Sequence, residues 1–222
     1  MLDAGLSNPQ ALAVAEELVT RYPALLPLRG GVIAVAGAVV ACHRRGGLVL
    51  VCGNGGSAAD SGHIVAELAK GFRLPRKPSP ETLANIRAIA GSKGDSHDGF
   101  DKLQRGVRAI DLAGSTALNT AVVNDLAGDL IFAQPVFVYG RPGDVLIAIS
   151  TSGNSVNVLK ALRVAKAHSL TTVGLTGQKP SKMDDACDIV IKAPASVTHE
   201  IQEFHLPIYH AICAMIEQEL FA

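Results

Sequence analysis

The sequence has no tryptophan, and aromatic residues of any kind make up only 4% of its 222 positions. Hydrophobic residues nevertheless account for 48% of the chain. Alanine, valine, leucine and isoleucine must therefore fill the interior, which is typical of layered α/β folds with buried aliphatic strands. A chain of this length is long enough to bury a substantial core and usually forms one large domain.

Net charge is also absent, because twenty basic residues balance twenty acidic ones. A protein that binds the nucleic-acid backbone normally has a basic excess, so we expect no nucleic-acid partner. The longest apolar run, residues 32–42, has about half of the ~20 residues that a membrane span needs. Residues 1–10 lack the basic start and apolar stretch of a signal peptide. We therefore expect a cytoplasmic protein with no membrane partner.

Paired cysteine motifs are missing too. The chain has four cysteines, and none of them forms a Cys-x-x-Cys pair: Cys42, Cys52, Cys187 and Cys213. A disulfide framework is not expected in a chain of this length with such spacing. We interpret the four side chains as buried thiols in a reducing compartment.

Apolar runs bounded by glycine and polar turns predict strands that alternate with helices. Buried strands are expected at 48–52, 145–149, 172–176 and 188–191, and helices at 9–21, 29–45, 57–70, 80–90, 156–168 and 198–221. Ser57 and Asp60 are interpreted as the start signal of the third helix. The alternation indicates a parallel sheet covered on both faces. No linker divides the chain, so we expect a single domain, 1–222, with an N-terminal helical arm at about 1–45.

One segment, at about 75–108, does not fit this alternation. It begins in a proline-rich stretch, residues 74–80, that excludes regular helix and central strand. Residues 91–99 are polar and rich in turn formers. We interpret the segment as an excursion from the core that acts as a lid or an interface arm. Its basic side chains are expected to be solvated: Arg76, Lys77, Arg87, Lys93, Lys102 and Arg105.

The loop at 150–155, with the sequence Ser-Thr-Ser-Gly-Asn-Ser, follows a predicted strand and precedes a predicted helix. Its four hydroxyl groups lie where free N–H groups and the positive end of the helix dipole favour a phosphate. Helix capping alone would need only one of these hydroxyls. We therefore favour phosphate binding over simple capping.

The loop at 53–58, with the sequence Gly-Asn-Gly-Gly-Ser-Ala, fits the pattern G-x-G-x-x-[GA] of dinucleotide-binding sites. That fingerprint also requires an acidic residue about 20 positions further on, at the end of a second strand. Residues 76–80 occupy that region, and they are basic and proline-rich. NAD binding is therefore a distant alternative. The absence of a G-x-x-x-x-G-K-[ST] sequence excludes a nucleotide-triphosphate loop.

His63 and Glu67 are four residues apart on the helix after this loop, so their side chains share one face. An imidazole with a carboxylate suits a zinc-like ion or an acid–base pair, although a surface hydrogen bond is the simpler explanation of an isolated pair. The C-terminal helix adds a Gln and three His side chains: His199, Gln202, His205 and His210. Spacing alone does not choose between His205 and His210 as partners, and Pro207 allows a kink between them.

Taken together, these motifs resemble the sugar-isomerase (SIS) domain, and most closely the phosphoheptose isomerases. The resemblance covers most of the chain beyond residue 46. Residues 52–67, residues 143–155 and Ile201-Gln202-Glu203 with His210 downstream are its most specific parts. It implies a flavodoxin-like three-layer α/β/α sandwich with a central parallel sheet. It also implies a homotetramer whose active sites lie at subunit interfaces.

The resemblance further implies one zinc ion per subunit, held by His63, Glu67, Gln202 and His210. Glu67 and His210 match the catalytic acid–base pair of the family. Contacts with a phosphosugar substrate would fall on Asn54, Gly55, Gly56, Glu67, Asn124, Asp125, Ser150, Thr151, Ser152, Ser155 and Gln202. The segment at 75–108 is longer than the corresponding connection in typical members, and it can reshape the substrate pocket.

The implied reaction converts sedoheptulose 7-phosphate to D-glycero-D-manno-heptose 7-phosphate, for ADP-heptose biosynthesis. A proton moves between adjacent carbons through an enediol while a metal polarises the carbonyl. Two alternatives stay open. One is a non-catalytic SIS-domain protein, either a sugar-phosphate sensor or a replication-initiator-associating adaptor; the other is an isomerase of a different phosphosugar. Binding-only members lack the matching Glu and His, so the presence of Glu67 and His210 favours an enzyme.

Overall fold

The computed structural model describes residues 5–90 and 99–222. The described residues build a five-stranded parallel sheet in the order β2-β1-β3-β4-β5. The strands are β1 (Val49–Gly53), β2 (Ala109–Asp111), β3 (Val145–Ile149), β4 (Thr171–Gly177) and β5 (Ile189–Ala193). This is the strand order of flavodoxin-like sheets. The predicted α/β/α fold is confirmed. The strand β2 was not predicted, because its three half-buried residues give too short an apolar run.

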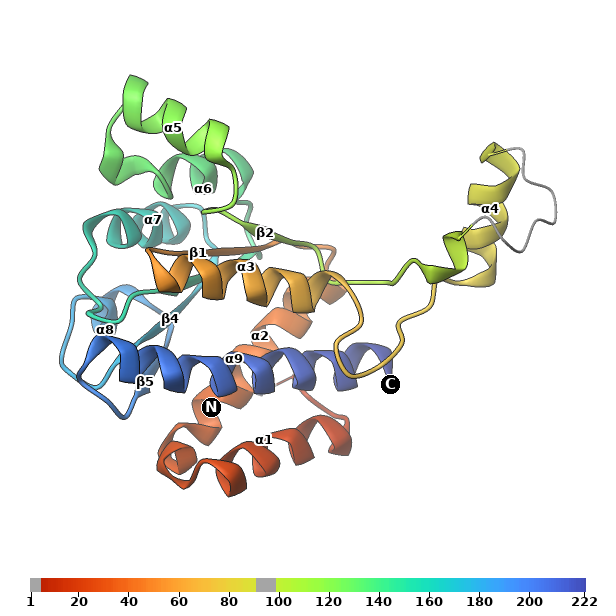
Figure 1. Ribbon diagram of the computed structural model, residues 1–222, viewed down its shortest axis with the longest axis horizontal. Coiled ribbons are helices and arrows are strands. Elements are labelled where there is room, and N and C mark those ends of the chain that lie inside the picture. Colours follow the sequence, from red (N-terminus) through yellow and green to blue (C-terminus); the bar gives the residue numbers. More distant parts are fainter. Residues whose placement is uncertain (1–4, 91–98) are drawn as a thin grey trace.

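Helices cover both faces of the sheet, forming the outer layers of the sandwich (Figure 1). One layer contains α2 (Arg29–Arg44), α3 (Gly56–Ala69) and α9 (Thr198–Phe221), with α1 (Pro9–Arg21) packed against α9. The other layer contains α6 (Ala133–Tyr139), α7 (Val156–Ala167) and α8 (Met183–Ala186), with η3 (Gly128–Leu130) and α5 (Thr116–Asp125) beyond them. The continuous α9 shows that Pro207 does not end the helix.

Alternate residues of the central strands face the two layers. Val145, Ile147 and Ile149 pack with α2, α3 and α9, whereas Leu146 and Ala148 pack with α6 and α7. Because successive side chains of a strand point to opposite faces, a strand covered on both sides needs an unbroken aliphatic run. All four cysteines are free and buried, as the sequence predicts.

The N-terminal part of the chain wraps the α9 side of the sheet through α1, the 3-10 helix η1 (Pro23–Leu28) and α2. By length and composition, residues Pro23–Arg44 form a helix able to cross a membrane, and this helix is longer than the apolar run at 32–42. Half of its most apolar window is buried inside the protein. Because α2 packs on α9 and β5, its position in the core accounts for its apolar composition.

Between α3 and β2 the chain leaves the body and forms α4 (Pro80–Ala90) and the short helix η2 (Phe100–Lys102), which project from the rest of the molecule (Figure 1). Of the predicted polar turn at 91–99, residues 91–98, including Lys93, lie outside the described residues. The expectation of a solvated Arg76 is wrong. Its side chain is fully buried at the root of the excursion, because its guanidinium pairs with the equally buried Glu217 at 2.8 Å.

Candidate active site

The glycine-containing loop at 53–58 and the hydroxyl-containing loop at 150–155 both begin at the middle of the sheet, after β1 and β3. The chain turns to opposite sides after β1 and β3, because β2 lies next to β1 and β4 lies next to β3. Such a switch point opens a crevice outside the carboxyl ends of the strands. The amide groups of Asn54 and Asn157 form a reciprocal pair of hydrogen bonds, at 2.9 and 3.0 Å, that ties the first loop to α7. The two predicted loops therefore meet at one end of the sheet.

The hydroxyl groups of the loop at 150–155 face one another. Ser150 Oγ lies 3.0 Å from Ser155 Oγ and 3.5 Å from Ser152 Oγ. Ser155 is the N-cap residue of α7, yet its side chain makes no capping hydrogen bond. The hydroxyls are thus not used to cap the helix, and they remain suited to an anion at its N-terminus.

A cavity of about 240 Å³ opens beside this loop. Thr151, Ser152 and Asn154 line one side, and Lys179 and Thr198 line another. The cavity therefore combines hydroxyl donors, the start of α9 and a lysine. This is a suitable setting for a phosphate group.

Helix α3 begins at Gly56, and its N-cap is Gly55, with φ +57° and no side-chain cap. Reading Ser57 and Asp60 as the start signal is therefore wrong. Glycine takes a positive φ without steric cost, so the backbone of Gly55 makes the turn itself, and Ser57 is buried inside. Gly56 is needed for a different reason: a Cβ there would lie 2.6 Å from Gln202 Nε2. Gln202 thus packs directly on the first turn of α3.

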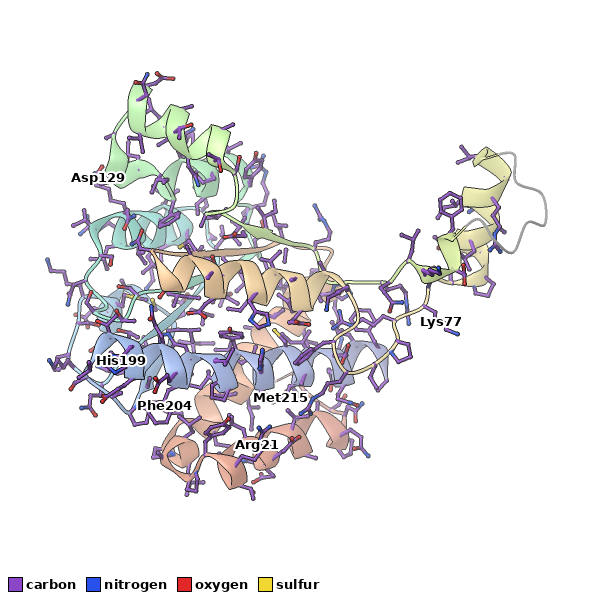
Figure 2. The ribbon with its side chains drawn as sticks, in the orientation of Figure 1. Arg21, Lys77, Asp129, His199, Phe204 and Met215 are labelled. Carbon is purple, nitrogen blue, oxygen red and sulfur yellow. The ribbon has the colours of Figure 1, made fainter. Side chains whose placement is uncertain are left out.

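Further along, α3 and α9 lie side by side and bring together three predicted site residues (Figure 1). His63 Nε2 lies 3.4 Å from Glu67 Oε1 and 3.3 Å from His210 Nε2. On α9 this cluster falls between Phe204 and Met215, which are labelled in Figure 2. His205 is not part of it, since its ring is fully buried and lies 3.3 Å from the Thr176 carbonyl. The structure thus places His210, rather than His205, with His63 and Glu67.

Electrostatics favour a neutral imidazole at His210. Burial, followed by the neighbouring His63, lowers the pKa of His210, although Glu67 acts in the opposite direction. A neutral imidazole has one free lone pair, which can accept a proton or bind a metal. The second oxygen of Glu67 faces the Lys70 ammonium group at 3.1 Å. The cluster thus contains two imidazoles and one carboxylate, the groups used in acid–base and metal chemistry.

A zinc ion suits these donor types. Tetrahedral ligands at 2.0–2.1 Å from zinc are about 3.3–3.4 Å from one another. The distances from His63 Nε2 to His210 and to Glu67 match this spacing. However, no three His, Cys, Asp or Glu side chains in the described chain, this cluster included, are arranged so that they could hold a metal ion as they stand. Gln202 is eight residues before His210, about 12 Å along the helix, and lies against Gly56. The roles of His63, Glu67, Gln202 and His210 as zinc ligands therefore stay predictions.

Asn124 and Asp125 lie apart from this cluster, at the end of α5. The Asn124 amide donates a hydrogen bond to the Asp125 carboxylate at 2.7 Å, and both residues are exposed. Among the hydrogen bonds of residues 5–90 and 99–222, none links either side chain to α3 or to the loop at 150–155. Within the described part of one chain, no hydrogen bond therefore joins these two residues to the other predicted substrate contacts.

Sequence reasoning missed two polar residues at the cluster. The Tyr209 hydroxyl lies 3.0 Å from His63 Nδ1 and donates to Asp60 Oδ1 at 3.3 Å. Asp60 is three residues before His63 on α3, so the helical period could have placed it on the same face. Tyr209 gave no such signal, because its partners are almost 150 positions away in the sequence.

Comparisons with known proteins agree with this architecture. Residues 26–109 and 99–177 match the family model described as the SIS domain. The phosphoheptose isomerase of Rhodospirillum rubrum is 40% identical over 185 residues, which are 83% of this chain and 84% of that protein. The chain belongs to the phosphoheptose isomerase family of SIS-domain proteins. The predicted family and the predicted enzyme class, an aldose–ketose isomerase, are both confirmed.

Solved structures support the same family assignment. The phosphoheptose isomerase from Neisseria gonorrhoeae has a TM-score of 0.70 and 30% identity, and the match covers 93% of this chain and 96% of that one. The phosphoheptose isomerase from Francisella tularensis has a TM-score of 0.68 and 28% identity, with 94% and 92% covered. The family fold therefore extends over nearly the whole chain.

Proposed function

We propose that this protein converts sedoheptulose 7-phosphate to D-glycero-D-manno-heptose 7-phosphate. The observation that supports this most directly is the meeting of His63, Glu67 and His210 on α3 and α9, two helices that begin at the carboxyl ends of the strands. The relatives named phosphoheptose isomerase support the choice of a seven-carbon substrate.

The loop at 150–155 would bind the phosphate and hold the far end of the sugar against the cluster. Fixing the reacting carbons in this way is worth several kcal/mol of the barrier. Glu67 would then take the proton from the carbon beside the carbonyl, and the electron pair of the broken C–H bond would form the C=C bond of the enediol. Return of that proton to the neighbouring carbon gives the aldose.

The same exchange needs one proton to pass from the hydroxyl oxygen to the carbonyl oxygen. His210 is suited to carry it, because burial lowers its pKa and a neutral imidazole can accept a proton and release it again. The reaction therefore needs both residues. Glu67 moves the proton on carbon, and His210 moves the proton on oxygen.

We further propose one zinc ion per subunit, held by His63, Glu67 and His210, with Gln202 as the fourth ligand implied by the resemblance. When bound, zinc would polarise the carbonyl as a Lewis acid. Replacement of His63 by Ala should reduce the zinc retained after mild purification from about one ion per chain to well below half of that. Elemental analysis measures this content. Equal zinc in both proteins would show that His63 is not a ligand.

We also propose the homotetramer with interfacial active sites. Such an assembly would explain why Asn124 and Asp125 lie apart from the cluster in a single chain, since a neighbouring copy could supply them. Sedimentation of the purified protein should give a species of four chains. A monomer at micromolar concentration would exclude this arrangement.

Purified protein supplied with zinc and sedoheptulose 7-phosphate tests the reaction. Formation of the aldose phosphate is expected. The competing function is that of a sugar-phosphate sensor, and the same sample distinguishes it when binding is followed by calorimetry. Tight binding of the ketose phosphate with no aldose formed would favour the sensor.

A further inference from the structure

Three polar side chains form a connected line that ends at His63: Asp60, Tyr209 and His63. Tyr209 is only 2% exposed. Its ring meets those of His63 and His210 edge-on, with centroids 5.4 and 5.1 Å apart. Its hydroxyl lies 3.0 Å from His63 Nδ1 and 3.3 Å from Asp60 Oδ1. The proposed proton transfers use neither Asp60 nor Tyr209, so their position needs a separate explanation.

The phenol has one proton and two neighbours that can accept it. If the Tyr209 hydroxyl donates to Asp60, its oxygen accepts the Nδ1–H group of His63, and Nε2 of His63 keeps a free lone pair. If the hydroxyl donates to His63 Nδ1 instead, the ring proton of a neutral His63 must lie on Nε2. The direction of this one hydrogen bond therefore decides the tautomer of His63.

The needs of Asp60 favour the first arrangement. In the part of the chain that the structure describes, Tyr209 provides the one hydrogen bond to this carboxylate, and Asp60 Oδ2 is buried without a partner. Burial raises the pKa of Asp60, and the hydrogen bond from Tyr209 opposes that shift. Leaving this partly buried carboxylate with no donor at all is costly, because its Oδ2 atom already has no partner. Donation to Asp60 avoids that cost, and His63 Nδ1–H gains an acceptor at 3.0 Å in the same arrangement.

The other nitrogen of His63 has less to gain from a proton. Its contacts with Glu67 Oε1 and His210 Nε2, at 3.4 and 3.3 Å, are longer than the 3.0 Å contact of Nδ1 with the Tyr209 hydroxyl. In this tautomer the lone pair on Nε2 faces the Glu67 carboxylate and the second imidazole, a position that attracts a cation. This tautomer therefore prepares the cluster for a cation.

We propose that Asp60 and Tyr209 are a positioning pair that holds His63 in the tautomer with its proton on Nδ1. They act through His63 and need not touch substrate. The tautomer itself does not depend on the reaction, whereas any effect on turnover rests on the proposed function. Partners of this kind commonly change metal affinity by 10–100-fold when they are removed.

The test uses the whole protein, freed of metal with a chelator, with ¹⁵N-labelled histidine at pH 8. Long-range ¹H–¹⁵N correlation spectra show which ring nitrogen carries the proton, and a His63→Gln variant assigns the signals. Wild-type His63 should be protonated on Nδ1. In Tyr209→Phe, which keeps the buried ring, His63 should become a mixture of tautomers. In Asp60→Ala, the hydroxyl is free to donate to His63, so the proton should move to Nε2.

Lys70→Ala is the matched control, because it removes a neighbour of Glu67 on the same helix without touching this line of residues. Its spectrum should resemble that of the wild type. Unchanged signals of a histidine outside the cluster, such as His168, show that each variant is folded. The proposal would be overturned if wild-type His63 were protonated on Nε2. It would also be overturned if the tautomer of His63 were the same as in the wild type in both Tyr209→Phe and Asp60→Ala.

Zinc affinity and turnover supply two separate readouts. A chelator competition should show 10–100-fold weaker zinc binding in Tyr209→Phe than in the wild type. If the tautomers change as expected but the wild type does not isomerise the sugar phosphate, the proposed function fails and the positioning role stands. If the wild type is active but its tautomer is unaffected by both variants, the positioning role alone fails.

Discussion

Two polar clusters join α9 to the α3 region, and they differ in how fully their hydrogen bonds are satisfied. At the C-terminal cluster, Glu217 accepts four hydrogen bonds of 2.7–3.0 Å, from Arg76 and from the backbone N–H groups of Phe72, Arg73 and Leu74. At the other cluster, the contacts of His63 with Glu67 and His210 are 3.3–3.4 Å, and the His63 side chain is 41% exposed.

The C-terminal cluster has the properties of a structural scaffold, and the cluster around His63 has those expected of the proposed reaction site. Arg76 also donates to the carbonyl groups of Leu68 and Glu67, so the saturated cluster fixes the end of α3 and the root of the excursion. A saturated network leaves no atom free for a ligand and serves to hold the backbone. The long contacts around His63 leave lone pairs that a cation, a proton or a substrate can use. Substitutions in the C-terminal cluster of Arg76 and Glu217 should therefore lower stability, and substitutions in the cluster of His63, Glu67 and His210 should lower turnover.

The largest effect on stability is expected from Arg76→Met. The substitution leaves the Glu217 carboxylate buried without its cation, which should cost about 3–5 kcal/mol of the free energy of unfolding. Urea unfolding measures the loss. The double variant Arg76→Met/Glu217→Met should recover part of it, because no buried charge remains. A loss below about 1 kcal/mol for the single variant would show that the saturated cluster is not the scaffold described.

Substitution of His205 should have the next largest effect on the free energy of unfolding, and this effect should depend on pH. Burial lowers the pKa of His205 to about 4, below its ordinary value of 6.5. The unfolded chain therefore binds a proton that the folded protein does not, and stability falls as the pH drops from about 6.5 to about 4. Between pH 7.5 and pH 5 this amounts to roughly 2 kcal/mol. His205→Gln should remove that part of the pH dependence in urea unfolding; identical dependence in both proteins would contradict it.

The smallest effect is expected from Lys70→Ala. Its ammonium pairs with Glu67, but the Lys70 side chain is 56% exposed, and exposed ion pairs contribute little. Turnover should stay within about threefold of the wild type and stability within about 0.5 kcal/mol. A more than tenfold loss of turnover would extend the reaction site to Lys70 and weaken the contrast between the two clusters.

The sheet was largely predictable, because strands buried on both faces need continuous aliphatic runs such as residues 145–149. The strand β2 was not, since its three residues are only half buried. The start of α3 was misread for a local reason: the positive φ of Gly55 makes the turn that a side-chain cap was expected to make. Local patterns therefore predicted the buried elements better than the turns between them.

The site was predictable only where its residues share a helix or a family motif. The spacing of His63 and Glu67 follows from the helical period, and the family resemblance pointed to His210. The contacts of Tyr209 with His63 and of Arg76 with Glu217 join positions more than 140 residues apart. No local pattern contains such pairs, because they depend on how α3 and α9 pack. A basic, proline-rich stretch also gave no sign that Arg76 would be buried.

The central claim is that the cluster of His63, Glu67 and His210 carries out the proton transfer, and Glu67→Gln tests this claim most directly. The amide keeps the size of the side chain but cannot take a proton from carbon. Turnover of sedoheptulose 7-phosphate should fall by about 10²–10⁴-fold, with affinity for the sugar phosphate and the urea midpoint close to those of the wild type. Unchanged turnover in a folded Glu67→Gln protein would contradict the account.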